Sequence, residues 1–400
     1  MSLEPLLGSK RIFICAGTGG VGKTSISAAI GLGAARRGHR VLVLTIDPSR
    51  RLAEALGIRK NTPEPVPLGP TRERMVGIVP PGALSVWVLD PKRVSDQTVM
   101  RLAPSEEAAR RLLANPIYQQ VTNMIAGMQE YTAMEALHGF VQQGTYDIVV
   151  LDTPPSRNAL NFLDAPRRLD DSINSRLIEL MVPREGGKKG TTRRFIERVL
   201  SGVFGAEFFG DLQVFFGAFG GLFAQLNGNA QAMRARLSEP DVAFILVGVG
   251  GEQSLAQARD FEQRIRELDL PLEAIVLNRS LVPLAQRPFV HHAMAATPPG
   301  HLREALSKLK ALAEKEAREI DRACVEADAL AARSDVPVVT VPELGTGVDD
   351  LPGLASVADW LFERQDSPSL EDLPHGTLEA LDTEEGVDVP RGVPVEGPVV

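Results

Sequence analysis

The sequence predicts an α/β fold, with a doubly wound and mostly parallel sheet and an α-helical insertion. Three observations support this fold class. Short apolar runs recur along the chain, helical patterns lie between most of them, and one glycine-rich loop joins an apolar run to a helical stretch. Strands of a parallel sheet are buried on both faces and are therefore apolar throughout, and helices connect them. A chain of 400 residues can hold one such domain with an insertion.

The first expected unit is a strand, a loop, a helix and a second strand. An apolar run at 11–16 precedes the glycine-rich loop, a helical stretch covers 24–37, and a second apolar run covers 40–46. This order is a βαβ unit, which implies parallel strands and a right-handed crossover. We expect further buried strands and two more helices at these positions: strands at 148–151, 243–247, 274–277 and 336–341, and helices at 255–268 and 301–332.

Two stretches break this alternation, at about 95–143 and 166–238. Neither contains a strand pattern, and the second holds eight of the fifteen phenylalanines of the chain. We interpret them as one helical subdomain inserted into a domain that covers residues 1–363. Residues 364–400 are predicted to form a disordered acidic tail, because residues 366–400 contain nine acidic residues, one arginine and no aromatic residue. Since the net charge of the whole chain is −8, the rest of the chain is roughly neutral. A neutral body gives no electrostatic case for a nucleic acid partner.

Cysteine content and hydropathy indicate a cytoplasmic protein. The two cysteines, Cys15 and Cys324, lie far apart and form no Cys-x-x-Cys motif, so neither a disulfide framework nor a cysteine zinc cluster is expected. The N-terminus has no basic segment followed by an apolar one, as a secretory signal would have. No run of 18 apolar residues is present, so we expect no membrane-spanning helix.

The glycine-rich loop predicts a phosphate-binding site. It satisfies the pattern G-x-x-x-x-G-K-[ST] directly after a strand and before a helix. In such a loop, backbone N–H groups and the helix N-terminus surround the β- and γ-phosphates. The lysine neutralises the phosphate oxygens and the final threonine binds Mg²⁺, so the expected ligand is Mg-ATP. The nucleotide-binding residues that we expect here are Gly17, Thr18, Gly19, Gly20, Val21, Gly22, Lys23, Thr24 and Ser25.

Two aspartates follow predicted strands at the edge of the sheet where phosphates would bind. Asp152 follows the apolar run at 148–151, and we expect it to bind Mg²⁺ together with Thr24. Asp47 follows the run at 40–46 and is our candidate for aligning or deprotonating the attacking water. The alternative for each is a helix N-cap or turn aspartate, because both precede turn-forming proline and serine residues.

Three motifs follow one another in the sequence. They are the glycine-rich loop, Thr-Ile-Asp-Pro-Ser-Arg-Arg-Leu at 45–52, and Leu-Asp-Thr-Pro-Pro-Ser-Arg-Asn-Ala-Leu-Asn-Phe-Leu-Asp-Ala-Pro at 151–166. In this order they resemble the arsenical-pump-driving ATPase family, which includes the ATPases that target tail-anchored membrane proteins. The resemblance covers most of residues 10–363 and looks closest to the bacterial single-domain, anion-transporting ATPase-like branch.

The resemblance implies a P-loop ATPase of the SIMIBI class that closes as a dimer around nucleotide. The segments that begin at Asp47 and Asp152 would be switch I and switch II. Asn278 matches the adenine-reading asparagine of the family, and Pro342 lies in the segment that matches the loop over the adenine ring.

The chain departs from the family pattern at the second loop position. Where the family usually has a lysine that reaches the partner's phosphates, this chain has Thr18. The dimer could therefore be a homodimer in which Arg50, Arg51 or Arg157 supplies the charge, or a heterodimer with a related ATPase subunit. The zinc-binding and metalloid-binding cysteines of some relatives are also missing, which argues against recognition of arsenite.

The helical subdomain leaves two interpretations open. Its apolar residues recur on one helical face, which is typical of a packed core but also of a groove for a hydrophobic client helix or a membrane-associated partner. The stripe is Phe204, Phe208, Leu212, Phe215, Phe219, Leu222, Phe223 and Leu226.

The function we expect is an ATP-hydrolysing dimeric switch that couples nucleotide state to handling of a client protein or associated complex. The alternatives are the motor subunit of an anion or metalloid export system, and a slow positioning or scaffold switch of the ParA/MinD type.

Overall fold

An eight-stranded sheet forms the centre of the structure, with strand order β3-β4-β2-β5-β1-β6-β7-β8. The computed structural model describes residues 2–45, 56, 62, 64–103, 105–121, 136–137, 139–153, 235–285, 301–344 and 350–363. The strands are β1 (Ile12–Ala16), β2 (Arg40–Thr45), β3 (Val66–Pro67), β4 (Ala83–Val88), β5 (Ile148–Asp152), β6 (Val242–Val249), β7 (Leu272–Ser280) and β8 (Val338–Pro342). Only β3 is antiparallel to its neighbour, so the predicted mostly parallel α/β sheet is confirmed.

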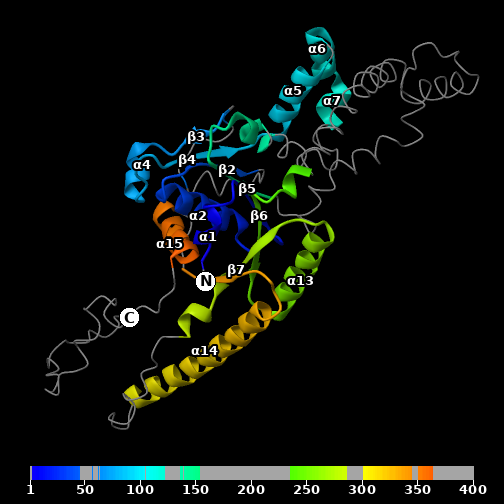
Figure 1. Ribbon diagram of the computed structural model, residues 1–400. Helices are drawn as coiled ribbons and strands as arrows, with labels where there is room; N and C mark the ends of the chain where they lie inside the picture. The colour runs from blue at the N-terminus through cyan, green and yellow to red at the C-terminus, as the bar shows by residue number, and fades with distance from the viewer. Residues whose placement is uncertain are drawn as a thin grey trace, which may run out of the picture. The chain divides into compact units, whose positions relative to one another are not determined.

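Helices cover both faces of this sheet (Figure 1). On one face α2 and α15 share a buried apolar cluster with Phe13 and Cys15 of β1, and on the other α13 and α14 share a second cluster with Ile12 and Ile14. All five residues of β1 are buried, which is why its sequence is apolar without alternation. The described helices are α1 (Glu4–Leu7), α2 (Lys23–Arg36), α4 (Pro70–Met75), α5 (Pro91–Leu102), α6 (Glu106–Ala114), α7 (Pro116–Val121), α13 (Glu252–Glu267), the 3₁₀ helix η1 (Val282–Leu284), α14 (His301–Ala331) and α15 (Leu351–Phe362).

The edge of the sheet was not predicted from the sequence. Strand β4 pairs in parallel with β2, and β3 pairs with β4 at the edge. In β4 only Leu84, Val86 and Trp87 are buried, because a strand close to the edge is covered less completely. Its sequence therefore lacks the continuous apolar run by which the inner strands are recognised.

Helices α5, α6 and α7 and the helical residues 136–137 and 139–143 represent the first predicted insertion among the described residues. Residues 166–234 of the second insertion, and with them the phenylalanine stripe, lie outside the described residues, as does the acidic tail. No helix among the described segments is both long enough and apolar enough to cross a membrane.

Candidate functional site

The glycine-rich loop joins β1 to α2 at the carboxyl edge of the sheet, as the sequence predicts. Gly17 has a φ of 154°, and a Cβ at this position would lie 2.2 Å from the carbonyl oxygen of Val247 in β6. Gly22 has a φ of 89°, and a Cβ there would lie 2.2 Å from Nδ2 of Asn278. The loop therefore passes so close to β6 and β7 that only glycine fits at these two positions.

Lys23 is the first residue of α2, and its side chain folds back over the loop. Its Nζ donates a hydrogen bond of 2.9 Å to the carbonyl oxygen of Thr18, and the residue is only 5% exposed. The ammonium group thus lies within the turn of the loop, close to the backbone N–H groups at the start of α2. A buried positive charge beside a helix N-terminus is an arrangement that can hold a polyphosphate.

Asp152 ends β5 and is fully buried. Its Oδ2 accepts a hydrogen bond of 2.8 Å from Oγ1 of Thr24 and another of 2.9 Å from Oγ1 of Thr45. Strand β5 lies between β1 and β2, and this position brings the carboxylate beside the loop. Both donors come from other elements of the fold, α2 and β2, so these contacts of Asp152 are tertiary and are not those of a helix N-cap.

Asn278 lies in β7 and contacts the loop directly. Its Nδ2 donates a hydrogen bond of 2.9 Å to the carbonyl oxygen of Val21, and the residue is 9% exposed. Pro342 is the buried last residue of β8 and pairs in register with Ser280 of β7. The two residues that the family resemblance assigns to the adenine thus lie on neighbouring strands at the same edge of the sheet.

Several predicted site residues lie outside the described residues. They are Asp47, Arg50, Arg51 and Arg157. Their roles stay predictions.

Sequence reasoning missed two buried hydroxyl groups at the site. Thr45 donates to Asp152, and Thr153 donates from Oγ1 to the carbonyl oxygen of Cys15 at 2.8 Å. Both are 1% exposed. The signal was a hydroxyl residue at the carboxyl end of a predicted strand. The partner of such a hydroxyl can be identified only when the order of the strands is known.

The donors present fit a magnesium ion that is bound together with phosphate. Mg²⁺ prefers oxygen ligands and is usually held by one or two carboxylates, with substrate phosphates and water completing its shell. Asp152 and Thr24 supply such oxygens next to the loop. Within the described part of the chain, no group of three or more His, Cys, Asp and Glu residues could hold a metal on its own.

The Cys15 thiol lies beside the loop but has low reactivity. Burial raises its pKa from 9.0 to about 12, and a contact with the Ser27 hydroxyl only partly opposes this. Cys324 is half-buried on α14, and burial and two nearby aspartates raise its pKa as well. Both thiols are thus protonated at neutral pH, whereas thiolates are what soft metalloid ions bind.

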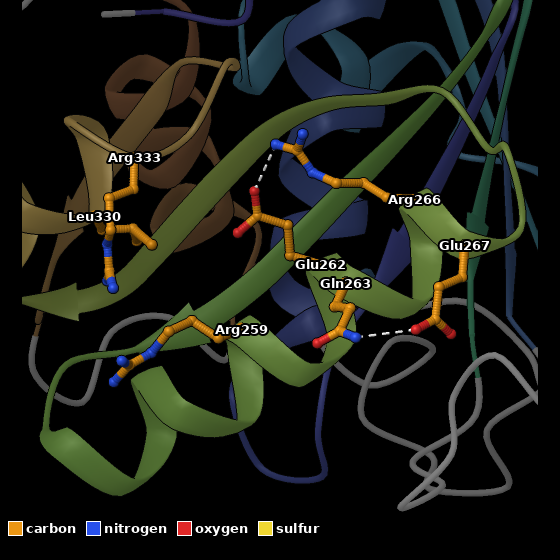
Figure 2. A pocket seen from close by; sticks show the side chains of 7 residues that line it. All are labelled: Arg259, Glu262, Gln263, Arg266, Glu267, Leu330 and Arg333. Carbon is orange, nitrogen blue, oxygen red and sulfur yellow. Dashed lines mark hydrogen bonds and ion pairs between the residues drawn. The ribbon is translucent and has the colours of Figure 1, made fainter.

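A hollow between α13 and the end of α14 is separate from the phosphate loop. It has a volume of about 330 Å³ and is lined by Arg259, Glu262, Gln263, Arg266, Glu267, Leu330 and Arg333. Figure 2 shows that charged and polar side chains at its rim bond to one another: Arg266 pairs with Glu262, and Gln263 with Glu267. All seven residues belong to α13, α14 or the turn after α14. This hollow is not the nucleotide site.

Comparison with known proteins agrees with the motifs and the fold. Residues 10–292 match the model of the family described as anion-transporting ATPase. The ATPase GET3 of Malassezia globosa is 24% identical, over 92% of this chain and 96% of the relative. The ATPase ASNA1 homolog of Trypanosoma cruzi is 27% identical, also over 92% and 96%. The ATPase GET3 of Kluyveromyces lactis is 26% identical over 70% of this chain and 77% of its own length.

Proposed function

Because the chain belongs to the anion-transporting ATPase family and is an ATPase, we propose that it is a magnesium-dependent dimeric switch that couples ATP hydrolysis to handling of a client protein. The observation that carries the proposal is the convergence of Lys23, Thr24 and Asp152 on one loop. An ammonium group, a hydroxyl and a carboxylate lie there within hydrogen-bond distance of the loop or of each other. These three groups have separate tasks in P-loop ATPases.

In the proposed reaction, water attacks the γ-phosphate in line with the leaving ADP oxygen. Lys23 and the loop N–H groups bind the phosphate oxygens and neutralise their charge, which lowers the barrier mainly by positioning and electrostatics. Thr24 and Asp152 would hold Mg²⁺, which would neutralise phosphate charge when bound. We assign the positioning of the water to Asp47, which lies two residues after Thr45 at the end of β2.

Asn278 is proposed to select adenine. Its Nδ2 is engaged by the carbonyl oxygen of Val21, so the orientation of the amide is defined. The opposite atom, Oδ1, is an acceptor and suits the amino group at position 6 of adenine. Guanine has an acceptor oxygen at that position, and two acceptors repel each other.

The client is proposed to be a protein with a hydrophobic helix. This part of the proposal is supported by the family resemblance and by the phenylalanine-rich stripe in the sequence at 204–226. Export of a metalloid is supported less well, because both thiols have raised pKa values. A slow scaffold switch stays an alternative, since Thr18 replaces the lysine that acts across the dimer in relatives.

Binding of ATP with and without Mg²⁺ tests the site. Lys23→Ala should abolish productive ATP binding, because the phosphates lose their buried counter-charge. Lys10→Ala is the matched control, since Lys10 instead contacts Glu273 and the carbonyl oxygen of Pro240. Equal ATP affinity in wild type and Lys23→Ala would contradict the proposed site.

Mass by light scattering tests the dimer. We expect Asp47→Asn to bind ATP nearly as well as wild type but to hydrolyse it slowly, so that the closed dimer accumulates with Mg-ATP. If the variant stays monomeric with Mg-ATP, the partner would instead be a related subunit that has a lysine at the loop position of Thr18. Unchanged hydrolysis would remove Asp47 from its proposed role.

A further inference from the structure

Thr45 ends β2 with its hydroxyl directed at the carboxylate of Asp152. The distance from Oγ1 of Thr45 to Oδ2 of Asp152 is 2.9 Å, and Thr45 is 1% exposed. The same oxygen accepts from Thr24 at 2.8 Å. Two hydroxyl donors from two different elements therefore meet on one buried carboxylate oxygen.

The two donors are held in different ways. Thr24 lies in the first turn of α2, directly after the phosphate loop. Thr45 lies within the sheet and pairs in register with Asp152 itself, because β2 and β5 are parallel neighbours. Thr45 is thus held by the ladder of backbone hydrogen bonds between β2 and β5.

A second donor matters because a carboxylate rotates easily. The terminal torsion of an aspartate side chain is broad, so the backbone alone does not define the plane of the carboxylate. Hydrogen bonds to an ionised group are shorter and stronger than those between neutral groups. Two donors from different elements on Oδ2 restrict the direction in which Asp152 presents its oxygens to a cation.

We propose that Thr45 is a positioning residue for magnesium, and that its hydroxyl holds Asp152 in the orientation required to bind Mg²⁺ together with ATP. This inference rests on the proposed function. Thr45 is also two residues before Asp47, so the same hydrogen bond ties the magnesium-binding acid to the strand that leads to the proposed water-positioning residue. A purely structural role for Thr45 would affect stability but not the dependence of nucleotide binding on magnesium.

Binding of a fluorescent ATP analogue, titrated with Mg²⁺ and repeated in EDTA, separates the two roles. Thr45→Val keeps the shape of the side chain and removes the hydroxyl. We expect nucleotide affinity in EDTA to stay at the wild-type value, while the Mg²⁺ concentration for half-maximal enhancement rises about 10- to 100-fold, as is typical for groups that orient metal ligands. Thr45→Ser, which keeps the hydroxyl, should restore the wild-type magnesium dependence.

Ser27→Ala is the matched control, because Ser27 is another fully buried hydroxyl residue, on α2 beyond Thr24. It should leave the magnesium dependence unchanged. A wild-type magnesium dependence in Thr45→Val, or an equal shift in Ser27→Ala, would overturn the inference. If Thr45→Val does not fold, Thr45→Ala is measured in its place with the same two outcomes. Nucleotide binding by the wild type that does not respond to magnesium would contradict the proposed function itself, and this inference with it.

Discussion

Asn278 of β7 holds the phosphate loop by a single hydrogen bond from its Nδ2 to the carbonyl oxygen of Val21. The two residues are 257 positions apart in the sequence, and the bond is buried. It joins the strand that is proposed to read the base to the loop that is proposed to bind the phosphates. The proposed base site and the proposed phosphate site are thus linked through the protein.

Asn278→Ala should weaken ATP binding and reduce the preference for ATP over GTP. Alanine lacks the Nδ2 donor for the carbonyl oxygen of Val21, so the loop loses its support, and it also lacks the Oδ1 acceptor that is proposed to read the adenine amino group. Removing one partner from a buried hydrogen bond costs roughly 1–3 kcal/mol, which corresponds to about a 5- to 150-fold loss of affinity. Calorimetry with ATP and GTP measures both effects. An unchanged ratio of the two affinities would rule out the role of Asn278 in base selection.

Gly22→Ala should destabilise the protein more than Gly20→Ala. Both glycines have positive φ values, 89° and 83°, so both substitutions carry the backbone strain of a left-handed residue, about 1–3 kcal/mol. Only at Gly22 would the new Cβ also meet Nδ2 of Asn278, at 2.2 Å, whereas the space around Gly20 is open. Thermal unfolding of the two variants measures the difference. Equal melting temperatures would mean that the Asn278 side chain moves away from the new Cβ at little cost in stability.

The ion pair of Asp147 with Arg40 should make a small, pH-dependent contribution to stability. The hydrogen bond from Arg40 lowers the pKa of Asp147 from 3.8 to about 2. Because the folded-state pKa is depressed, this stabilisation is present above the unfolded pKa of 3.8 and is lost as the pH falls to about 2. Both side chains are more than one third exposed, so solvent weakens the effect. Urea unfolding of Asp147→Asn should show a slightly lower midpoint than wild type at pH 6, and the difference should shrink towards pH 2. A constant difference across this range would contradict the assignment.

Thiol labelling should distinguish the two cysteines. At pH 8 we expect Cys324 to react slowly and Cys15 not at all, because Cys15 is completely buried and its pKa is raised to about 12. Unfolding in guanidinium should expose both thiols. In Cys324→Ser the folded protein should show no reactive thiol. Rapid labelling of this variant would mean that β1, beside the loop, opens. Metalloid binding by Cys15 would then again be a candidate function.

The α/β class, the inner strands and the phosphate loop could all be predicted from the sequence. Each of these depends on a local pattern. Inner parallel strands such as β1 are apolar at every position because both faces are buried, and the loop is recognised by glycines and a lysine at fixed spacing between a strand and a helix.

The distant residues that meet at this loop could not be predicted, because their meeting depends on the order of the strands in the sheet. Thr45 and Asp152 are 107 positions apart, and they form a pair because β2 and β5 are neighbours in the sheet. Strand β4, next to the edge strand β3, also became visible only in the structure, since partial burial leaves no continuous apolar run. A local sequence pattern indicates whether a segment is buried on one face or on both. The order of the strands depends on packing between segments that are far apart in the sequence.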